Sequence, residues 1–142
     1  MHIYTKILIF IVLGSIAAGC ELIDISKHSV RTHIDLTQDT PEGVVCLFLA
    51  ELDSCNDKGA SVLMLPENGS VPRATQRVAS YPEMQRLGRV LRKSPVTMVS
   101  LDTIAENKFR VLVEIDSYKN YKFTTKRVDK LWFITHYDYM SN

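Results

Sequence analysis

The sequence has few of the residues and motifs that define the common functional classes. Its 142 residues include three cysteines, none in CxxC spacing, which excludes a disulfide-rich scaffold and a zinc ribbon. Neither sign of charge dominates, since 17 Lys and Arg stand against 16 Asp and Glu for a net charge of +1. That balance argues against a nucleic-acid partner. The sequence also lacks a glycine-rich phosphate loop, a serine nucleophile elbow and an HExxH motif, so we expect no cofactor and no metal.

The composition that remains is that of one folded domain. The chain is 46% hydrophobic and 23% charged, which is ordinary for a globular protein. Its length holds one domain with a real core and hardly two. Clues to function must therefore come from the amino terminus and from single side chains within that domain.

The amino terminus has the pattern of a secretory signal. Lys6 precedes an apolar run at residues 7–16, and small residues follow at positions 17–19. A positive residue, a short apolar run and small residues at the end define a signal peptide. The run is shorter than the ~20 residues that span a bilayer, so a permanent transmembrane helix is the weaker interpretation.

The residues Ala17, Ala18, Gly19 and Cys20 resemble the bacterial lipobox, in which the cysteine thiol receives diacylglycerol and cleavage occurs before it. The resemblance implies a cleaved signal peptide at residues 1–19 and a lipid anchor on Cys20, since two or more acyl chains hold a protein firmly to a membrane. Leucine is commonest where Ala17 stands, so an ordinary signal peptide cleaved near Ala18 is the alternative. The residue after the cysteine is Glu21, whereas an aspartate there would resemble an inner-membrane retention signal. Its absence favours the periplasmic face of the outer membrane.

The mature chain divides into a tether and a domain. Residues 20–38 lack strong periodicity and are predicted to be the lipidated amino terminus and tether, while residues 39–142 form the domain. His28 and His33 lie five residues apart with Asp35 nearby, but on a tether we interpret them as solvated side chains.

Helical spacing dominates the first half of the domain. Thr40 and Pro41 predict a helix start, and a buried stripe follows at Val44, Val45, Phe48, Leu49 and Leu52. A weaker helical turn is predicted at residues 58–65. A third helix is expected to begin near Ser80, which has capping-box spacing with Glu83, and to end at Ser94 before Pro95.

Period-two alternation dominates the second half. Strands are predicted at residues 96–104, 109–115, 121–127 and 131–137, separated by short polar turns. Helices followed by a meander of strands indicate an α+β fold. We therefore expect about three helices packed on one face of a curved antiparallel sheet of about four strands.

This order of elements resembles the nuclear transport factor 2-like (cystatin-like) superfamily, and within it a group of small bacterial lipoproteins of unknown function. The similarity lies in residues 40–49, in the pair of later helices before long strands, and in residues 127–134, where a charged turn precedes Trp132 and an apolar strand. The resemblance covers roughly residues 38–139. It implies a cone formed by sheet and helices, often with a ligand pocket at the open end, and often a homodimer formed through the sheet.

Enzymes of that superfamily place Asp, His, Tyr or Arg inside the cone. The resemblance makes Asp102, His136, Trp132 and Tyr137 the candidate pocket residues here, and alternation suggests that His136 shares a face with Trp132 and Ile134. No pair of carboxylates or other titratable groups has a spacing that specifies acid–base catalysis. We therefore expect a protein that is not an enzyme.

Two other groups of residues are candidates for interactions. Arg86, Arg89, Arg92 and Lys93 predict a basic helix face that could bind a polar partner. Cys46 and Cys55 are nine residues apart, so a continuous helix would separate them by ~13.5 Å, beyond the ~7 Å that a disulfide spans. A disulfide would require the helix to turn back, and we favour a buried Cys46 and a free Cys55.

Together these patterns predict a lipid-anchored protein of the bacterial cell envelope that acts as a non-enzymatic binding or accessory module. Its expected partners are the membrane, through Cys20, and an envelope protein or small ligand, with a homodimer as a further expectation. Two alternatives remain. One is an envelope enzyme with its active site in the cone, and the other is an immunity-type lipoprotein that neutralises a partner protein.

Overall fold

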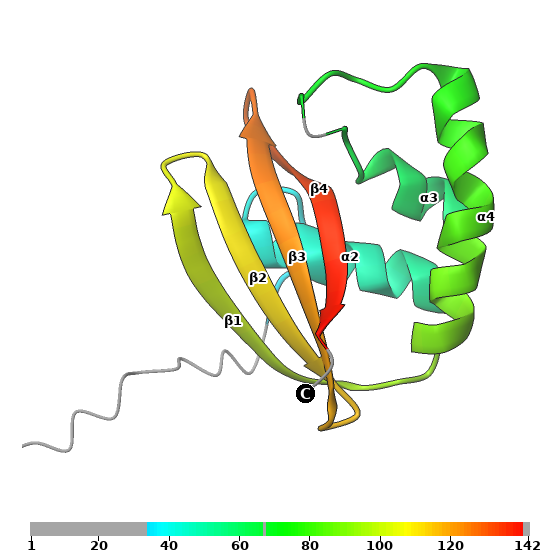
Figure 1. The fold of residues 1–142 in the computed structure, drawn as a ribbon, viewed down its shortest axis with the longest axis vertical. Helices are drawn as coiled ribbons and strands as arrows, with labels where there is room; N and C mark the ends of the chain where they lie inside the picture. The colour runs from blue at the N-terminus through cyan, green and yellow to red at the C-terminus, as the bar shows by residue number, and fades with distance from the viewer. Residues whose placement is uncertain (1–33, 67, 141–142) are drawn as a thin grey trace, which may run out of the picture.

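The computed structural model describes residues 34–66 and 68–140, and the domain is an α+β fold (Figure 1). Three helices precede four strands in the chain. The helices are α2 (Pro41–Asp53), α3 (Asp57–Val62) and α4 (Ala74–Leu91), and the strands are β1 (Val96–Ala105), β2 (Lys108–Ile115), β3 (Lys119–Val128) and β4 (Leu131–Met140). The predicted signal peptide, the lipidation of Cys20 and the histidines at positions 28 and 33 lie outside the described residues.

The first helix begins where the sequence predicts it. The hydroxyl oxygen of Thr40 accepts the N–H of Gly43 at 3.0 Å, and Pro41 occupies the first helical position. The helix ends at Asp53, after which Cys55 adopts a left-handed conformation and the chain turns into α3. The side chain of Asn56 caps α3 by accepting the N–H of Gly59.

The predicted start of the last helix near Ser80 is wrong, because α4 begins six residues earlier at Ala74. The N–H of Arg73 is satisfied by the Gln76 side chain at 2.8 Å, so a cap forms there. The Ser80 hydroxyl donates to the carbonyl of Arg77 within the helix and does not cap anything. Pro82 lies inside α4 on its exposed side. The helix continues through it although proline has no backbone N–H to donate.

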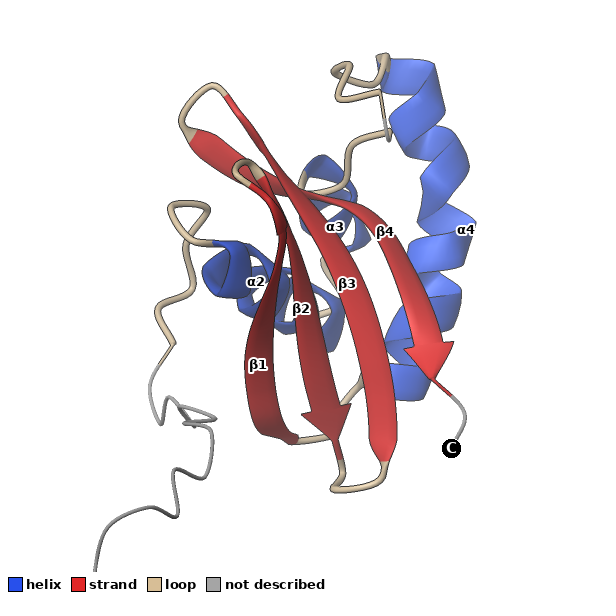
Figure 2. Cartoon of the chain, turned by 60° about the vertical axis from the view of Figure 1, so that its left-hand side comes forward, coloured by secondary structure: helices blue, strands red, loops and turns tan. Residues whose placement is uncertain are grey.

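The four strands form one open antiparallel sheet in the order β1-β2-β3-β4, and the helices cover one of its faces (Figure 2). We call the face towards the helices the inner face and the opposite one the outer face. Strands β2 and β3 pair without interruption, from Lys108 opposite Lys126 to Ile115 opposite Lys119. The pairing of β3 with β4 shifts by one residue between Thr124 and Thr125, which is a β-bulge at Thr135 on β4.

The core lies between the inner face and α2, with α3 and α4 closing its side. Phe48 of α2 is fully buried and packs edge-on against Phe123 of β3, with ring centroids 6.1 Å apart. Buried residues that alternate along the strands complete this core, namely Val111, Val113, Ile115, Tyr121, Trp132 and Ile134. The inner face is therefore filled by side chains over most of its area.

Candidate functional site

An apolar groove lies at the side of the core where α2 meets β1. Its volume is about 380 Å³, and it is open to solvent. Ten of its lining residues are apolar and three are polar. They are Ile34, Leu36, Cys46, Leu49, Ala50, Leu91, Val96, Met98, Val99 and Ile115, with Asp53, Ser94 and Thr97.

Helical periodicity places two adjacent stripes on α2, and the second forms one wall of the groove. Val44, Phe48 and Leu52 face the core. Cys46, Leu49, Ala50 and Asp53 are spaced by three and four residues and face the groove. The opposite wall is the first half of β1, residues 96–99. Leu91 at the end of α4 and Ser94 in the turn after it also line the groove.

The polar groups around the groove already have partners. Asp53 accepts the backbone N–H of Lys93 at 2.7 Å, and the Thr97 hydroxyl donates to the Glu114 carboxylate at 2.7 Å. The first bond ties α2 to the segment after α4, and the second ties β1 to β2. Because ten of the thirteen lining residues are apolar, the groove is suited to apolar packing.

Cys46 is the one thiol among the residues that line the groove. Burial, with a smaller effect from nearby Glu42, raises its pKa to about 11. The thiol thus stays protonated at neutral pH and is a poor nucleophile. Both Cys46 and Cys55 are free thiols, with Cys46 half-buried and Cys55 exposed, so the two form no disulfide.

The structure does not bring the four predicted pocket residues together, and none of them lines the groove. Trp132 and Tyr137 lie on the inner face, whereas Asp102 and His136 are exposed on the outer face. The expectation that His136 shares a face with Trp132 and Ile134 is wrong. The extra residue at the β-bulge, Thr135, reverses the alternation so that Tyr137 points inward and His136 outward.

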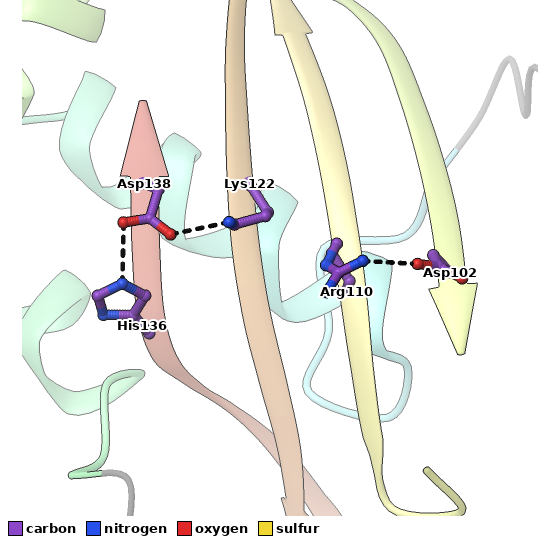
Figure 3. A network of polar contacts seen from close by, with 5 residues as sticks. All are labelled: Asp102, Arg110, Lys122, His136 and Asp138. Carbon is purple, nitrogen blue, oxygen red and sulfur yellow. Dashed lines mark hydrogen bonds and ion pairs between the residues drawn. The ribbon is translucent and has the colours of Figure 1, made fainter. Parts of the chain in front are cut away.

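On the outer face these residues take part in an open network of ion pairs (Figure 3). Arg110 binds Asp102 at 2.9 Å, Lys122 binds Asp138 at 3.1 Å, and His136 lies 2.9 Å from the other oxygen of Asp138. Lys122 and then His136 lower the pKa of Asp138. Each carboxylate is paired with a basic side chain on the neighbouring strand, and the pairs are partly exposed, so each contributes little to stability.

Tyr137 has a structural role between β4 and α4. Its hydroxyl donates to Glu83 at 2.6 Å, and burial together with this bond raises the pKa of the phenol. A phenol that stays protonated and donates to a helix carboxylate joins the two elements.

The predicted basic face is present on α4 and just beyond its end. Arg86, Arg89 and Lys93 are exposed and Arg92 is half-buried. None of the four forms an ion pair with a carboxylate among the described residues. The face is thus available to solvent, and its binding of a polar partner stays a prediction.

Within residues 34–66 and 68–140, no three His, Cys, Asp or Glu side chains gather where they could hold a metal ion. No helix in that part of the chain is both long enough and apolar enough to cross a membrane.

Sequence reasoning missed the groove. The second stripe on α2 was visible in the spacing of Leu49 and Asp53. The other wall of the groove depends on where the tertiary fold places β1, which the sequence does not reveal.

Comparison with known protein families and with curated proteins finds no match to this chain. Among solved structures, a protein from Sphaerobacter thermophilus is similar over 73% of this chain and 99% of its own. The two are 8% identical, and the TM-score is 0.42.

Proposed function

We propose that this protein is a lipid-anchored component of the bacterial cell envelope whose nuclear transport factor 2-like domain binds a small apolar ligand without catalysing a reaction. Cys20 is the proposed attachment site, and the periplasmic face of the outer membrane is the proposed location. The groove between α2 and β1 is the proposed binding site. The resemblance described from the sequence is part of this proposal.

The observation that carries the binding role is the apolar lining of the groove. Small-molecule sites are typically concave, mostly apolar and ~300–1,000 Å³ in volume, with a few polar groups at the edge. The groove fits that description at about 380 Å³, with Asp53, Ser94 and Thr97 as its polar residues. A ligand without negative charge fits best, because Asp53 is the one charged residue of the lining and its carboxylate would repel an anion.

Two features favour binding over catalysis. General acids and bases need positions that tune their pKa towards the working pH. Cys46, an ionisable group that lines the groove, has its pKa shifted away from neutrality. The other candidates for acid–base work, Asp102 and His136, lie on the outer face away from the groove.

The anchor is tested by intact mass and membrane fractionation of the native protein beside a Cys20→Ser variant. We expect the native protein to carry a lipid mass on residue 20 and to sediment with the outer membrane. The variant should lose the lipid mass and nearly all membrane association, because a serine hydroxyl is not the acceptor in a lipobox. If both proteins are soluble and unmodified, the anchor is excluded, and the groove can still be tested by itself.

Ligand binding is tested with a neutral, largely apolar fluorescent probe, the aromatic amine N-phenylnaphthylamine. We expect the wild type to give a saturable enhancement of fluorescence. The dissociation constant of Ala50→Phe should be at least about tenfold higher, since the new ring fills the groove. Ala79→Phe is the matched control, because Ala79 is exposed on α4 and does not line the groove. Equal binding by the two variants would contradict a site in the groove.

A further inference from the structure

The two edges of the sheet are treated differently by the rest of the chain. At the β4 edge, the backbone N–H of Trp132 donates to the carbonyl of Gln38, and the Gln38 side chain returns a bond to the Trp132 carbonyl. On the same side, the N–H of Ile134 donates to the carbonyl of Leu63 at 2.9 Å, and the N–H of Leu65 donates to the carbonyl of Ile134 at 2.8 Å. The outward backbone groups in the first half of β4 are therefore covered by the chain itself.

The pairing pattern identifies the outward backbone groups of β1. Just beyond the β2–β3 ladder, the N–H of Arg127 donates to the carbonyl of Asn107, which makes this a hydrogen-bonded pair. Because such pairs alternate in an antiparallel ladder, the odd residues of β2 bond to β3 and the even ones bond to β1. Met98, Ser100 and Asp102 lie opposite those even residues. The backbone groups of Val99, Leu101 and Thr103 thus point away from the sheet.

No described residue forms a hydrogen bond with the outward backbone groups of these three residues. Among residues 34–66 and 68–140, no backbone or side-chain hydrogen bond from outside the ladder reaches Val99, Leu101 or Thr103. Sheet edges of this kind are usually protected by proline, lysine or a short strand, because unpaired strands associate with one another. Strand β1 is ten residues long and contains no proline and no lysine.

The side chains of β1 are also compatible with a neighbour. Val96, Leu101 and Ile104 are each 42% exposed, so β1 presents apolar side chains that a neighbouring strand could contact. Asp102 is the single charged residue of β1, and Arg110 neutralises it from within the same sheet at 2.9 Å. No unbalanced charge on β1 therefore opposes the approach of a second strand.

We propose that two copies of this protein associate through β1, edge to edge and antiparallel, to form a continuous eight-stranded sheet with Leu101 on the two-fold axis. In this register Leu101 faces its own copy, and Val99 lies opposite Thr103 of the second copy. Each of the three pairs exchanges two backbone hydrogen bonds, so every outward group of Val99, Leu101 and Thr103 is used.

The sequence of β1 selects this register over its neighbours. Moving the axis to Asp102 would place the two Asp102 carboxylates directly opposite each other, which is unfavourable. Moving it to Ser100 would leave Thr103 outside the block of paired residues. With the axis at Leu101, Ser100 lies opposite Asp102 of the second copy on the outer face, and Leu101 meets an identical apolar side chain on the inner face. Self-complementarity of this kind is what a two-fold contact requires.

Amide hydrogen exchange of the purified full chain at several protein concentrations tests the pairing directly. We expect the amides of Val99, Leu101 and Thr103 to become protected as concentration rises, while Ser100 and Asp102 are protected at every concentration because they bond to β2. Protection of the same three amides in a particle with the mass of one chain would overturn the proposal, since the covering strand would then be part of that chain. Absence of protection at all concentrations would overturn it as well.

Sedimentation of two lysine variants tests the position of the axis. Leu101→Lys places two ammonium groups at the axis, so we expect its dimer dissociation constant to rise on the order of tenfold or more. Leu131→Lys is the matched control, because Leu131 at the start of β4 is 41% exposed and Leu101 is 42% exposed. Equal dimerisation by both variants, or a wild type that stays monomeric at high concentration, would contradict this contact.

Discussion

Replacing Phe48 with alanine is expected to lower the free energy of unfolding by about 3–5 kcal/mol. Phe48 is fully buried on the core stripe of α2 and packs against Phe123 of β3. Loss of the ring removes its apolar burial and leaves a cavity between α2 and the sheet, where the surrounding strands cannot collapse freely. Urea denaturation followed by circular dichroism measures the difference.

Tyr118→Ala is the control for that measurement. Tyr118 lies in the turn between β2 and β3 and is 63% exposed, so removing its ring should change the free energy of unfolding by less than about 0.5 kcal/mol. If Phe48→Ala were as stable as Tyr118→Ala, Phe48 would not be the main contact between α2 and the sheet.

Replacing Gly43 with alanine is expected to destabilise the domain by about 1–3 kcal/mol. A Cβ at this position would lie 2.7 Å from both the Thr37 carbonyl oxygen and the Thr40 hydroxyl, and 2.9 Å from the Asp35 carbonyl oxygen. Two of these atoms belong to the backbone, so the segment before α2 would have to move. That movement would also disturb the Thr40 cap and the bonds between Gln38 and Trp132.

Gly88→Ala provides a comparison within another helix. A Cβ on Gly88 would meet Arg92 and Leu52 at 3.6 Å or more, which is ordinary van der Waals contact. Alanine is also the better helix former, so this variant should be more stable than the wild type by up to about 1 kcal/mol. Thermal unfolding of both glycine variants should therefore shift in opposite directions. A stabilising effect of Gly43→Ala would contradict the close approach before α2.

Local chemistry explains the elements that were predicted from the sequence. Thr40 and Pro41 act within one turn of the chain, so the start of α2 was readable without knowledge of the fold. The α+β class followed from helical spacing before period-two spacing, and the structure confirms it. A short polar turn between the last two strands was also predicted. In the structure this turn joins β3 to β4, and Asp129 within it has a positive φ of 56°.

Two predictions failed. Ser80 and Glu83 have the spacing of a capping box, yet α4 passes through them because the cap forms earlier, where the Gln76 side chain accepts the N–H of Arg73. Alternation along β4 was counted without the β-bulge at Thr135. A single extra residue moves His136 to the opposite face, and nothing in the spacing of β4 alone reveals it.

The sequence by itself determined the class of the fold and the order of its elements, because these depend on residue spacing and on short motifs. The lipid anchor at Cys20 rests on a short motif in the same way and stays a prediction. Only the tertiary structure decided which side chains meet. It separated Asp102 and His136 from Trp132 and Tyr137, formed a groove from α2 and β1, and covered the first half of the β4 edge. At the other edge, the outward backbone groups in the middle of β1 have no partner in the described part of the chain. These outcomes depend on strand register and on contacts between residues far apart in the chain, and neither has a local signature in the sequence.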